Sequence, residues 1–129
     1  MRIDEDVETI TTRPVVLIDS QATLADAARL LTNESIGVAI VRNYHPPALV
    51  SERDLVVALA EGARPELEHV DSVMSLEVAC AGPHDSIGTV ARMMLDNEIR
   101  HVPIVQDGAV VRVVSEREVL RALLANEPA

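Results

Sequence analysis

The sequence predicts a mixed α/β fold built from two copies of one β-α-β-β-α unit. The tetrapeptide Ser51–Asp54 (SERD) recurs as Ser115–Glu118 (SERE), 115 − 51 = 64 residues later, and each follows an apolar run. That interval is close to half of the 129 residues, which indicates a tandem duplication. A copy of this size buries little core by itself, so we expect the two copies to fold as one module.

Each copy begins with a short amphipathic lead-in. Residues 1–12 carry apolar side chains at helical spacing among acids, and residues 66–74 repeat this pattern. The sequence therefore divides into repeat 1, residues 1–64, and repeat 2, residues 65–129.

Strands are predicted from apolar and β-branched runs. Val15–Ile18 predicts a short buried strand, whereas its counterpart Val78–Ala81 is too weak for a prediction from propensity. Ile36–Val41 and Ile99–Val105 predict central strands, and Pro103 must lie where no ladder donor is needed. Turn residues then lead to the strands that end in the repeated tetrapeptide.

Each copy also contains two predicted helices. Apolar residues recur at i, i+3, i+4 and i+7 over Leu24–Leu31 and again over Ile87–Met94. Thr23 provides a start signal, and Asn33 and Asn97 provide stop signals.

The second helix of each copy follows the tetrapeptide. Gly62 and Asn126 occupy matching positions at its end, where left-handed geometry is common. We expect the apolar faces Leu24/Leu31 and Leu55/Leu59, with their repeats, to be exposed and to favour self-association.

The composition restricts the classes of function. A net charge of −10 opposes binding along a nucleic-acid backbone, and Tyr44 is the sole aromatic residue that could stack on bases. Cys80 is the single cysteine, so no disulfide framework and no cysteine metal site are expected. No apolar run approaches the length of a membrane span, and the N-terminus is acidic where a signal peptide is basic. We expect a cytoplasmic protein without nucleic-acid or membrane partners.

Three motifs in this order resemble a pair of cystathionine-β-synthase (CBS) domains, the Bateman module: Val50–Leu55 (VSERDL), Val70–Ser75 (VDSVMS) and Ile99–Ile104 (IRHVPI). The resemblance covers residues 7–126. It implies two repeats packed by pseudo-twofold symmetry, with two clefts for adenosine-containing ligands such as AMP, ADP, ATP or S-adenosylmethionine. It also implies a regulatory homodimer that holds no cofactor tightly and signals through an effector protein, as yet unknown.

The resemblance makes the cleft containing Asp54 the favoured site. In the family the aspartate accepts hydrogen bonds from ribose, the serine and basic side chains meet phosphate, and aliphatic side chains hold the adenine. A carboxylate can accept two hydroxyl donors, and a helix N-terminus offers free N–H groups to an anion. Carried over by motif, this site comprises Leu49, Ser51, Arg53, Asp54, Met74, Ala79, Ile99, Arg100 and His101.

The second cleft is expected to bind more weakly. Glu118 replaces the aspartate there and is one methylene longer, and Gly37 and Val38 carry no charge where the first cleft has Arg100 and His101. By the same resemblance this site comprises Thr11, Val16, Ile36, Ser115, Arg117 and Glu118.

Other interpretations stay open beside ligand binding. Ser51 and Asp54 also form a plain helix cap. Ala48 and Arg112 stand where the family usually has a glycine, which favours the alternative of a ligand-free dimeric interaction module.

Catalysis and metal binding are not expected from the sequence. Ser51 lies beside a helix start without the glycines of a nucleophile elbow, so we expect no enzyme. His45, His69 and His84 lie in separate loops or linkers, so we expect no metal site from them.

Overall fold

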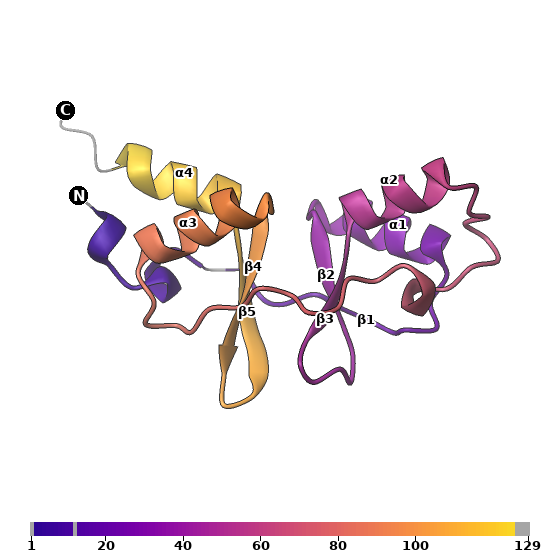
Figure 1. Ribbon diagram of the computed structural model, residues 1–129, viewed down its shortest axis with the longest axis horizontal. Coiled ribbons are helices and arrows are strands. Elements are labelled where there is room, and N and C mark those ends of the chain that lie inside the picture. The colour runs from indigo at the N-terminus through magenta and orange to yellow at the C-terminus, as the bar shows by residue number, and fades with distance from the viewer. Residues whose placement is uncertain (1, 12, 126–129) are drawn as a thin grey trace. The chain divides into compact units, whose positions relative to one another are not determined.

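The computed structural model describes residues 2–11 and 13–125, and the chain folds as two compact units. Unit A is the continuous segment Val16–Val78. Unit B combines Met1–Val15 with Ala79–Ala129. Each unit places two helices together on one side of a small sheet, so the predicted mixed α/β fold is confirmed (Figure 1).

Unit A contains a three-stranded sheet in the order β1-β2-β3. The predicted central strand lies between a parallel neighbour and an antiparallel one, with Leu17 opposite Ile40 and Val38 opposite Ser51. The first strand is shorter than predicted, and Leu17 is 42% exposed because one side of this edge strand faces solvent. The elements are β1 (Leu17–Ile18), α1 (Leu24–Glu34), β2 (Val38–Val41), β3 (Ala48–Ser51), α2 (Glu52–Ala60) and a 3-10 turn, η3 (Val70–Ser72).

The core of unit A contains several residues that the sequence analysis assigned to an exposed face. Leu24, Leu31 and Leu55 are 2%, 4% and 9% exposed, and they pack among the strands of their own unit. The prediction that they form a free apolar surface is therefore wrong. Helix periodicity identifies a buried face, but it does not say whether the same unit or another chain covers it.

Unit B contains the antiparallel pair β4-β5, with His101 opposite Ser115 and Pro103 opposite Val113. The Pro103 carbonyl accepts a hydrogen bond from the Ala81 amide at 3.0 Å, so the weak segment before it contributes a single bridge. The elements are η1 (Arg2–Asp4), η2 (Val7–Ile10), α3 (Ile87–Asn97), β4 (His101–Gln106), β5 (Ala109–Ser115) and α4 (Glu116–Ala125).

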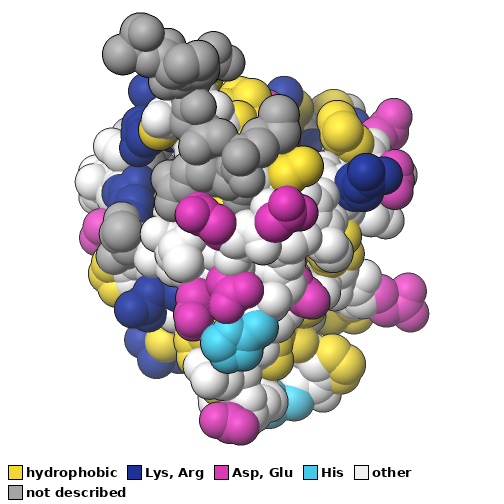
Figure 2. Space-filling model, turned by 90° about the vertical axis from the view of Figure 1, so that its left-hand side faces the viewer, with side chains coloured by type: hydrophobic (Ala, Val, Ile, Leu, Met, Phe, Trp, Pro, Cys, Tyr) yellow, Lys and Arg dark blue, Asp and Glu magenta, His cyan; other side chains and the backbone are white. Residues whose placement is uncertain are grey.

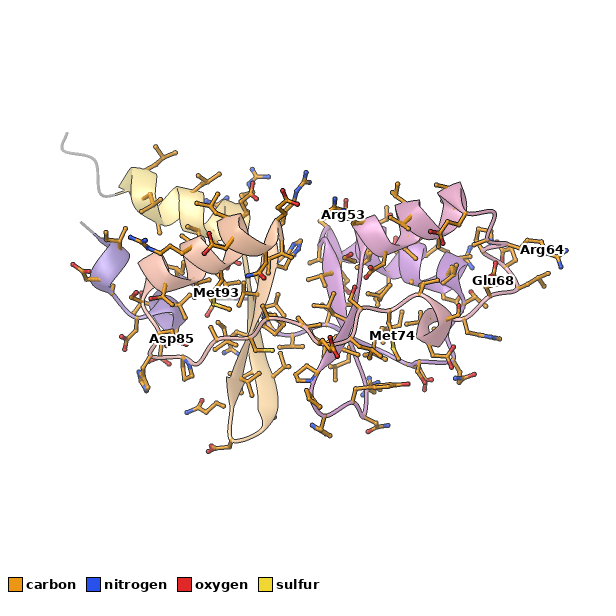
Figure 3. The ribbon with its side chains drawn as sticks, in the orientation of Figure 1. Arg53, Arg64, Glu68, Met74, Asp85 and Met93 are labelled. Carbon is orange, nitrogen blue, oxygen red and sulfur yellow. The ribbon has the colours of Figure 1, made fainter. Side chains whose placement is uncertain are left out.

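The lead-in of each sequence repeat packs in the unit that carries the helices of the other repeat. Val7 N donates to Asp85 O at 2.8 Å, and Val70 N, 63 residues later, donates to Ala22 O at 2.8 Å. Val7 and Val70 are both 0% exposed. The compact units therefore differ from the sequence repeats 1–64 and 65–129 by an exchange of lead-ins. Asp85, which receives the first lead-in, is labelled in Figure 3.

Helix ends follow the predicted chemistry at the start and depart from it at the stop. Thr23 caps α1, since its hydroxyl accepts from the Asp26 amide at 3.0 Å. Asn33 lies inside α1, whereas Asn97 is the last residue of α3; Ser35 (φ 54°) takes the left-handed position that ends α1, as Glu98 does for α3. Gly62 has φ 91°, as expected, and Asn126 lies outside the described residues.

Candidate functional site

The favoured site begins where β3 turns into α2. Ser51 Oγ accepts a hydrogen bond from the Asp54 amide at 3.1 Å, and Asp54 Oδ2 accepts one from the Ser51 amide at 2.9 Å. This reciprocal capping box confirms the predicted structural role of the two residues. It holds the half-buried carboxylate at a helix N-terminus, where free N–H groups and the helix dipole favour negative charge.

A second hydroxyl fixes the other oxygen of the same carboxylate. Ser75 Oγ donates to Asp54 Oδ1 at 2.8 Å. Ser75 is itself held by the backbone of β3. Its amide donates to Leu49 O at 2.7 Å, and its carbonyl accepts a hydrogen bond from the Leu49 amide at 3.1 Å. The sequence analysis did not select Ser75. Its place in the VDSVMS motif was the available signal, and the equivalent residue of repeat 1, Thr12, lies outside the described residues.

The Asp54 carboxylate keeps capacity to accept further hydrogen bonds. A carboxylate offers about four lone-pair sites, and the Ser51 amide and the Ser75 hydroxyl use two of them. Figure 3 shows Arg53 at the start of α2 and Met74 on the segment that precedes Ser75. Arg53 is exposed, and Met74 is half-buried against the core of unit A.

The second box lies at the end of β5 and differs in one respect. Glu118 Oε1 accepts from both the Ser115 amide, at 2.9 Å, and the Ser115 hydroxyl, at 3.1 Å. The longer side chain thus folds back on its own cap. Thr11, which was predicted for this site, is 8% exposed in unit B, and its hydroxyl donates to Glu8 O at 3.3 Å within the lead-in.

The predicted basic residues lie at the start of β4. His101 is the strand partner of Ser115, and the Glu116 amide donates to Arg100 O at 2.8 Å. The Arg100 side chain is exposed and His101 is half-buried. The remaining predicted residues are apolar and half-buried. Val16 and Ile36 of the weaker site lie in unit A, and Ala79 and Ile99 of the favoured site lie in unit B.

Members of each predicted set are divided between the two units. Unit A holds Leu49, Ser51, Arg53, Asp54 and Met74 of the favoured site, and unit B holds Ala79, Ile99, Arg100 and His101. The structure therefore describes two half-sites, each by itself, and their union remains a prediction.

Two further titratable groups of unit B have shifted pKa values. A hydrogen bond from the His84 imidazole to the Asp6 carboxylate, with the negative charges of Glu8 and Asp6, raises the pKa of His84. Burial raises the pKa of the Cys80 thiol. The side chain is half-buried, which agrees with its expected role as a small apolar residue.

The comparison with known families decides the identity of the fold. A model described as CBS domain matches twice, over residues 7–61 and 70–125. The chain belongs to the CBS-domain family. The resemblance inferred from the three motifs is confirmed, and CBS pairs are generally regulatory modules that are typically not enzymes.

CBS relatives of this chain differ in length. The CBS domain-containing protein YhcV of Bacillus subtilis is 25% identical over 123 residues, which are 95% of this chain and 87% of that protein. Uncharacterized protein MJ1225 of Methanocaldococcus jannaschii is 27% identical over 94% of this chain, which spans 44% of that relative. This chain therefore corresponds to less than half of the second relative.

Several solved structures match nearly the whole chain. An uncharacterized conserved protein from Pyrococcus horikoshii has a TM-score of 0.87 at 16% identity, over 100% of this chain and 98% of that one. A hexameric CBS-CP12 protein from bloom-forming cyanobacteria has a TM-score of 0.84 at 26% identity, over 96% of this chain and 75% of that one. The CBS domain pair of protein MJ0100, in complex with 5′-methylthioadenosine and S-adenosyl-L-methionine, has a TM-score of 0.82 at 22% identity. The match covers 92% of this chain and 98% of that one.

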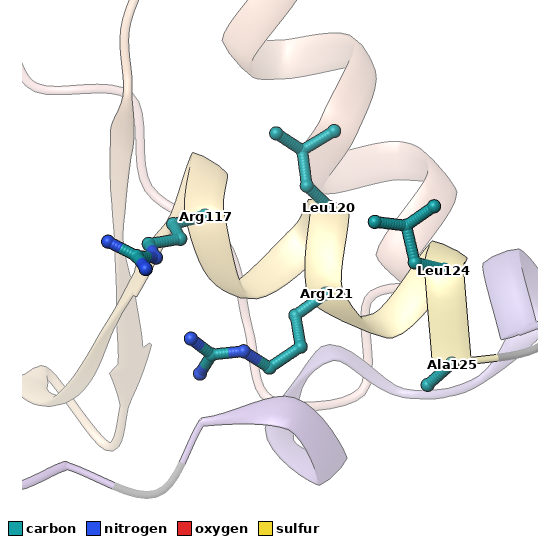
Figure 4. A pocket seen from close by; sticks show the side chains of 5 residues that line it. All are labelled: Arg117, Leu120, Arg121, Leu124 and Ala125. Atoms are coloured by element: carbon teal, nitrogen blue, oxygen red, sulfur yellow. The ribbon is translucent and has the colours of Figure 1, made fainter.

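The outer surface of α4 carries a shallow hollow lined by Arg117, Leu120, Arg121, Leu124 and Ala125 (Figure 4). All of these residues come from one helix, so the hollow is open and cannot enclose a small molecule. Leu120 and Leu124 are 52% and 68% exposed, which leaves an apolar stripe on a helix face. Arg117, predicted for the weaker site, lies beside this stripe. None of the described helices is both long enough and apolar enough to cross a membrane.

Proposed function

We propose that this chain is a regulatory module that binds an adenosine-containing ligand and transmits the change to a partner chain. The observation that carries the proposal is the half-buried Asp54 carboxylate, which Ser51 and Ser75 orient while leaving part of its accepting capacity unused. Membership of the CBS family supports the regulatory role. The complex of the MJ0100 domain pair with two adenosine derivatives supports this class of ligand.

Each contact residue has a proposed role. Asp54 accepts hydrogen bonds from the ribose hydroxyls, because a carboxylate can take two such donors. Arg53 and Arg100 neutralise phosphate, together with the N–H groups at the start of α2. Leu49, Met74, Ala79 and Ile99 hold the adenine between aliphatic side chains, with Ser51 and His101 at the edge of the ligand. The set around Glu118 is the weaker candidate. The proposal includes a cytoplasmic location and no tightly bound cofactor.

The test is isothermal titration of the native chain with AMP, ADP, ATP, S-adenosylmethionine and NAD(H), each without added metal. Asp54→Ala and Arg100→Ala are expected to abolish or strongly weaken the heat of binding. A ligand present at 100 times its Kd stabilises the fold by about 2.7 kcal/mol, so a thermal melt provides a second readout.

The matched control is Glu118→Ala, which removes the equivalent carboxylate from the other capping box and is expected to leave the stronger binding event unchanged. If Asp54→Ala leaves the heat of binding unaltered, the ligand does not bind at Asp54. A chain that responds to none of these ligands would leave the ligand-free module as the function.

That second candidate is a dimeric interaction module, and the stripe on α4 favours it. At the 64-residue offset, Leu120 and Leu124 correspond to Val56 and Ala60 of α2, and Val56 is 64% exposed. Both second helices therefore present small apolar faces. In contrast, the methyl group of Ala48, at the family's glycine position, is fully buried in the core of unit A and does not itself argue against a ligand.

We propose that a second copy of this chain covers these faces. The hexameric assembly of a cyanobacterial CBS protein at 26% identity supports self-association. Leu120→Glu is expected to lower the mass measured by sedimentation equilibrium, since a charge would be buried unpaired. Leu95→Glu, on an α3 residue that is 79% exposed, is the control and is expected to leave the mass unchanged. An unaltered mass for Leu120→Glu would exclude this surface.

A further inference from the structure

A histidine and two carboxylates meet where the first lead-in packs against the start of α3. His84 Nδ1 lies 2.9 Å from Asp6 Oδ2 and 3.8 Å from Glu8 Oε1. One potential ligand atom from each residue lies within 4.8 Å of the other two. Figure 2 shows a histidine bordered by acidic side chains on this face. Local patterns could not predict this cluster, because 84 − 6 = 78 positions separate His84 from Asp6.

Backbone hydrogen bonds and the buried side chain of Val7 bring the two segments together. The Val7 amide donates to Asp85 O at 2.8 Å, and the Glu8 amide donates to Pro83 O at 3.2 Å. Val7, whose side chain is fully buried, separates the two acids and anchors both of them. The three side chains would therefore stay close together even if the contacts of His84 with Asp6 and Glu8 were replaced by bonds to a ligand.

We propose that His84, Asp6 and Glu8 form a surface site for a divalent transition-metal ion of the zinc or nickel type. Ligand atoms about 2.1 Å from a tetrahedral zinc ion lie about 3.4 Å apart. The observed separations of 2.9 and 3.8 Å lie on either side of that value, so small rotations of the side chains suffice. This inference extends beyond the nucleotide site and does not depend on it.

The donor set determines the class of ion. Two carboxylates balance the charge of a dication, and an imidazole nitrogen favours zinc, nickel or copper over magnesium and calcium. The exposed fractions of the His84, Asp6 and Glu8 side chains are 73%, 45% and 49%, which leaves space for water in the remaining coordination positions. An open site of this kind binds exchangeably and is not a closed structural centre.

Unit A provides a natural comparison for the site. The 63-residue offset places Gln21 where His84 stands, and His69 and Asp71 where Asp6 and Glu8 stand. There the Gln21 amide donates from Nε2 to Asp71 Oδ2 at 2.8 Å. An amide N–H is a donor and cannot coordinate a cation. His84→Gln therefore replaces the imidazole with the amide that stands at the matched position in unit A.

The experiment is calorimetric titration of the full chain, stripped with EDTA and desalted, with ZnCl₂, NiCl₂ and MgCl₂ in separate runs. We expect one equivalent of zinc and of nickel to bind, and no magnesium at the same concentrations. His84→Gln and Glu8→Gln should each weaken zinc binding by at least about tenfold, since even the loss of an outer-shell partner has an effect of that size. His69→Gln, at the matched position in unit A, should leave the affinity unchanged.

Circular dichroism checks that the variants fold, which is expected because His84 and Glu8 are exposed. Zinc should also raise the melting temperature of the native chain, but not that of His84→Gln, because the ion joins the lead-in to the start of α3. The proposal is overturned if the native chain takes up neither zinc nor nickel, or if zinc binds His84→Gln as tightly as the native chain. Neither result bears on the nucleotide site, which is tested without metal.

Discussion

The exchanged lead-in predicts a specific loss of stability when its anchor is truncated. Val7 is fully buried in unit B, where it packs with Ile87, Val90 and the strands of the sheet. Val7→Ala removes two carbon atoms, each worth about 0.8 kcal/mol of burial. The space left behind adds roughly 1 kcal/mol, because a packed core relaxes only in part. We expect the free energy of unfolding to fall by about 2 to 3 kcal/mol.

The measurement is urea denaturation followed by far-UV circular dichroism, since Tyr44 is the only aromatic residue and reports poorly on unit B. With a typical urea slope of about 1 to 3 kcal/mol/M, the midpoint should drop by roughly 1 to 3 M. Val70→Ala, the equivalent change in unit A, should have a similar effect, because Val70 is also 0% exposed and makes the same backbone hydrogen bond.

Thr9→Ala is the control, because Thr9 is an exposed residue in the same 3-10 turn. Its effect should stay within about 0.5 kcal/mol. If Val7→Ala moved the midpoint no further than Thr9→Ala does, the lead-in would not be part of the core of unit B, and the exchange would be refuted.

Three further predictions concern individual side chains. A double-mutant cycle of Ser75→Ala and Asp54→Asn should give a coupling energy of about 1 kcal/mol in urea denaturation, because the 2.8 Å hydrogen bond joins them; additive effects would exclude it. Hydrogen bonds from Thr23, together with Arg29, hold the pKa of Asp26 below its ordinary value of 3.8. The ionised Asp26 side chain therefore stabilises the folded chain at pH values above 3.8, and this stabilisation is lost as the pH falls through the lowered pKa. The stability difference between the native chain and Asp26→Asn should shrink over that range, and a constant difference would contradict this. Because burial raises the pKa of Cys80, iodoacetamide at pH 8 should alkylate it more slowly in the folded chain than in urea, as followed by mass spectrometry; equal rates would contradict this.

Local patterns predicted the helices and most strands because the signals were local. The face shared by Leu24 and Leu31 repeats over Ile87–Met94, and both segments form helices of 11 residues. The segment Val78–Ala81 could not be predicted, since its single bridge pairs Ala81 with Ile104, which lies more than 20 positions away. The left-handed residues that end α1 and α3 are a serine and a glutamate, which composition does not mark as helix stops.

The candidate site was predictable only in its local part. The Ser51–Asp54 box follows from spacing, because a capping box needs residues three positions apart. Ser75 contacts Asp54 across 21 positions, and its place in the VDSVMS motif marks it as a candidate without indicating that contact. The association of a lead-in with the helices of the other repeat is a property of chain topology. Amphipathic spacing shows that a segment needs a partner without showing which partner it takes.

The exchange of lead-ins also governs how this chain can be divided. Residues 16–78 are one uninterrupted stretch, whereas the remaining unit is assembled from both ends of the polypeptide. Cutting at the duplication boundary after residue 64 would separate each pair of helices from the lead-in that packs against it. Each fragment would instead keep the lead-in that packs in the other unit. A single proteolytic nick near residue 15 would cut the covalent link between Val7 and the middle stretch while leaving that stretch uninterrupted.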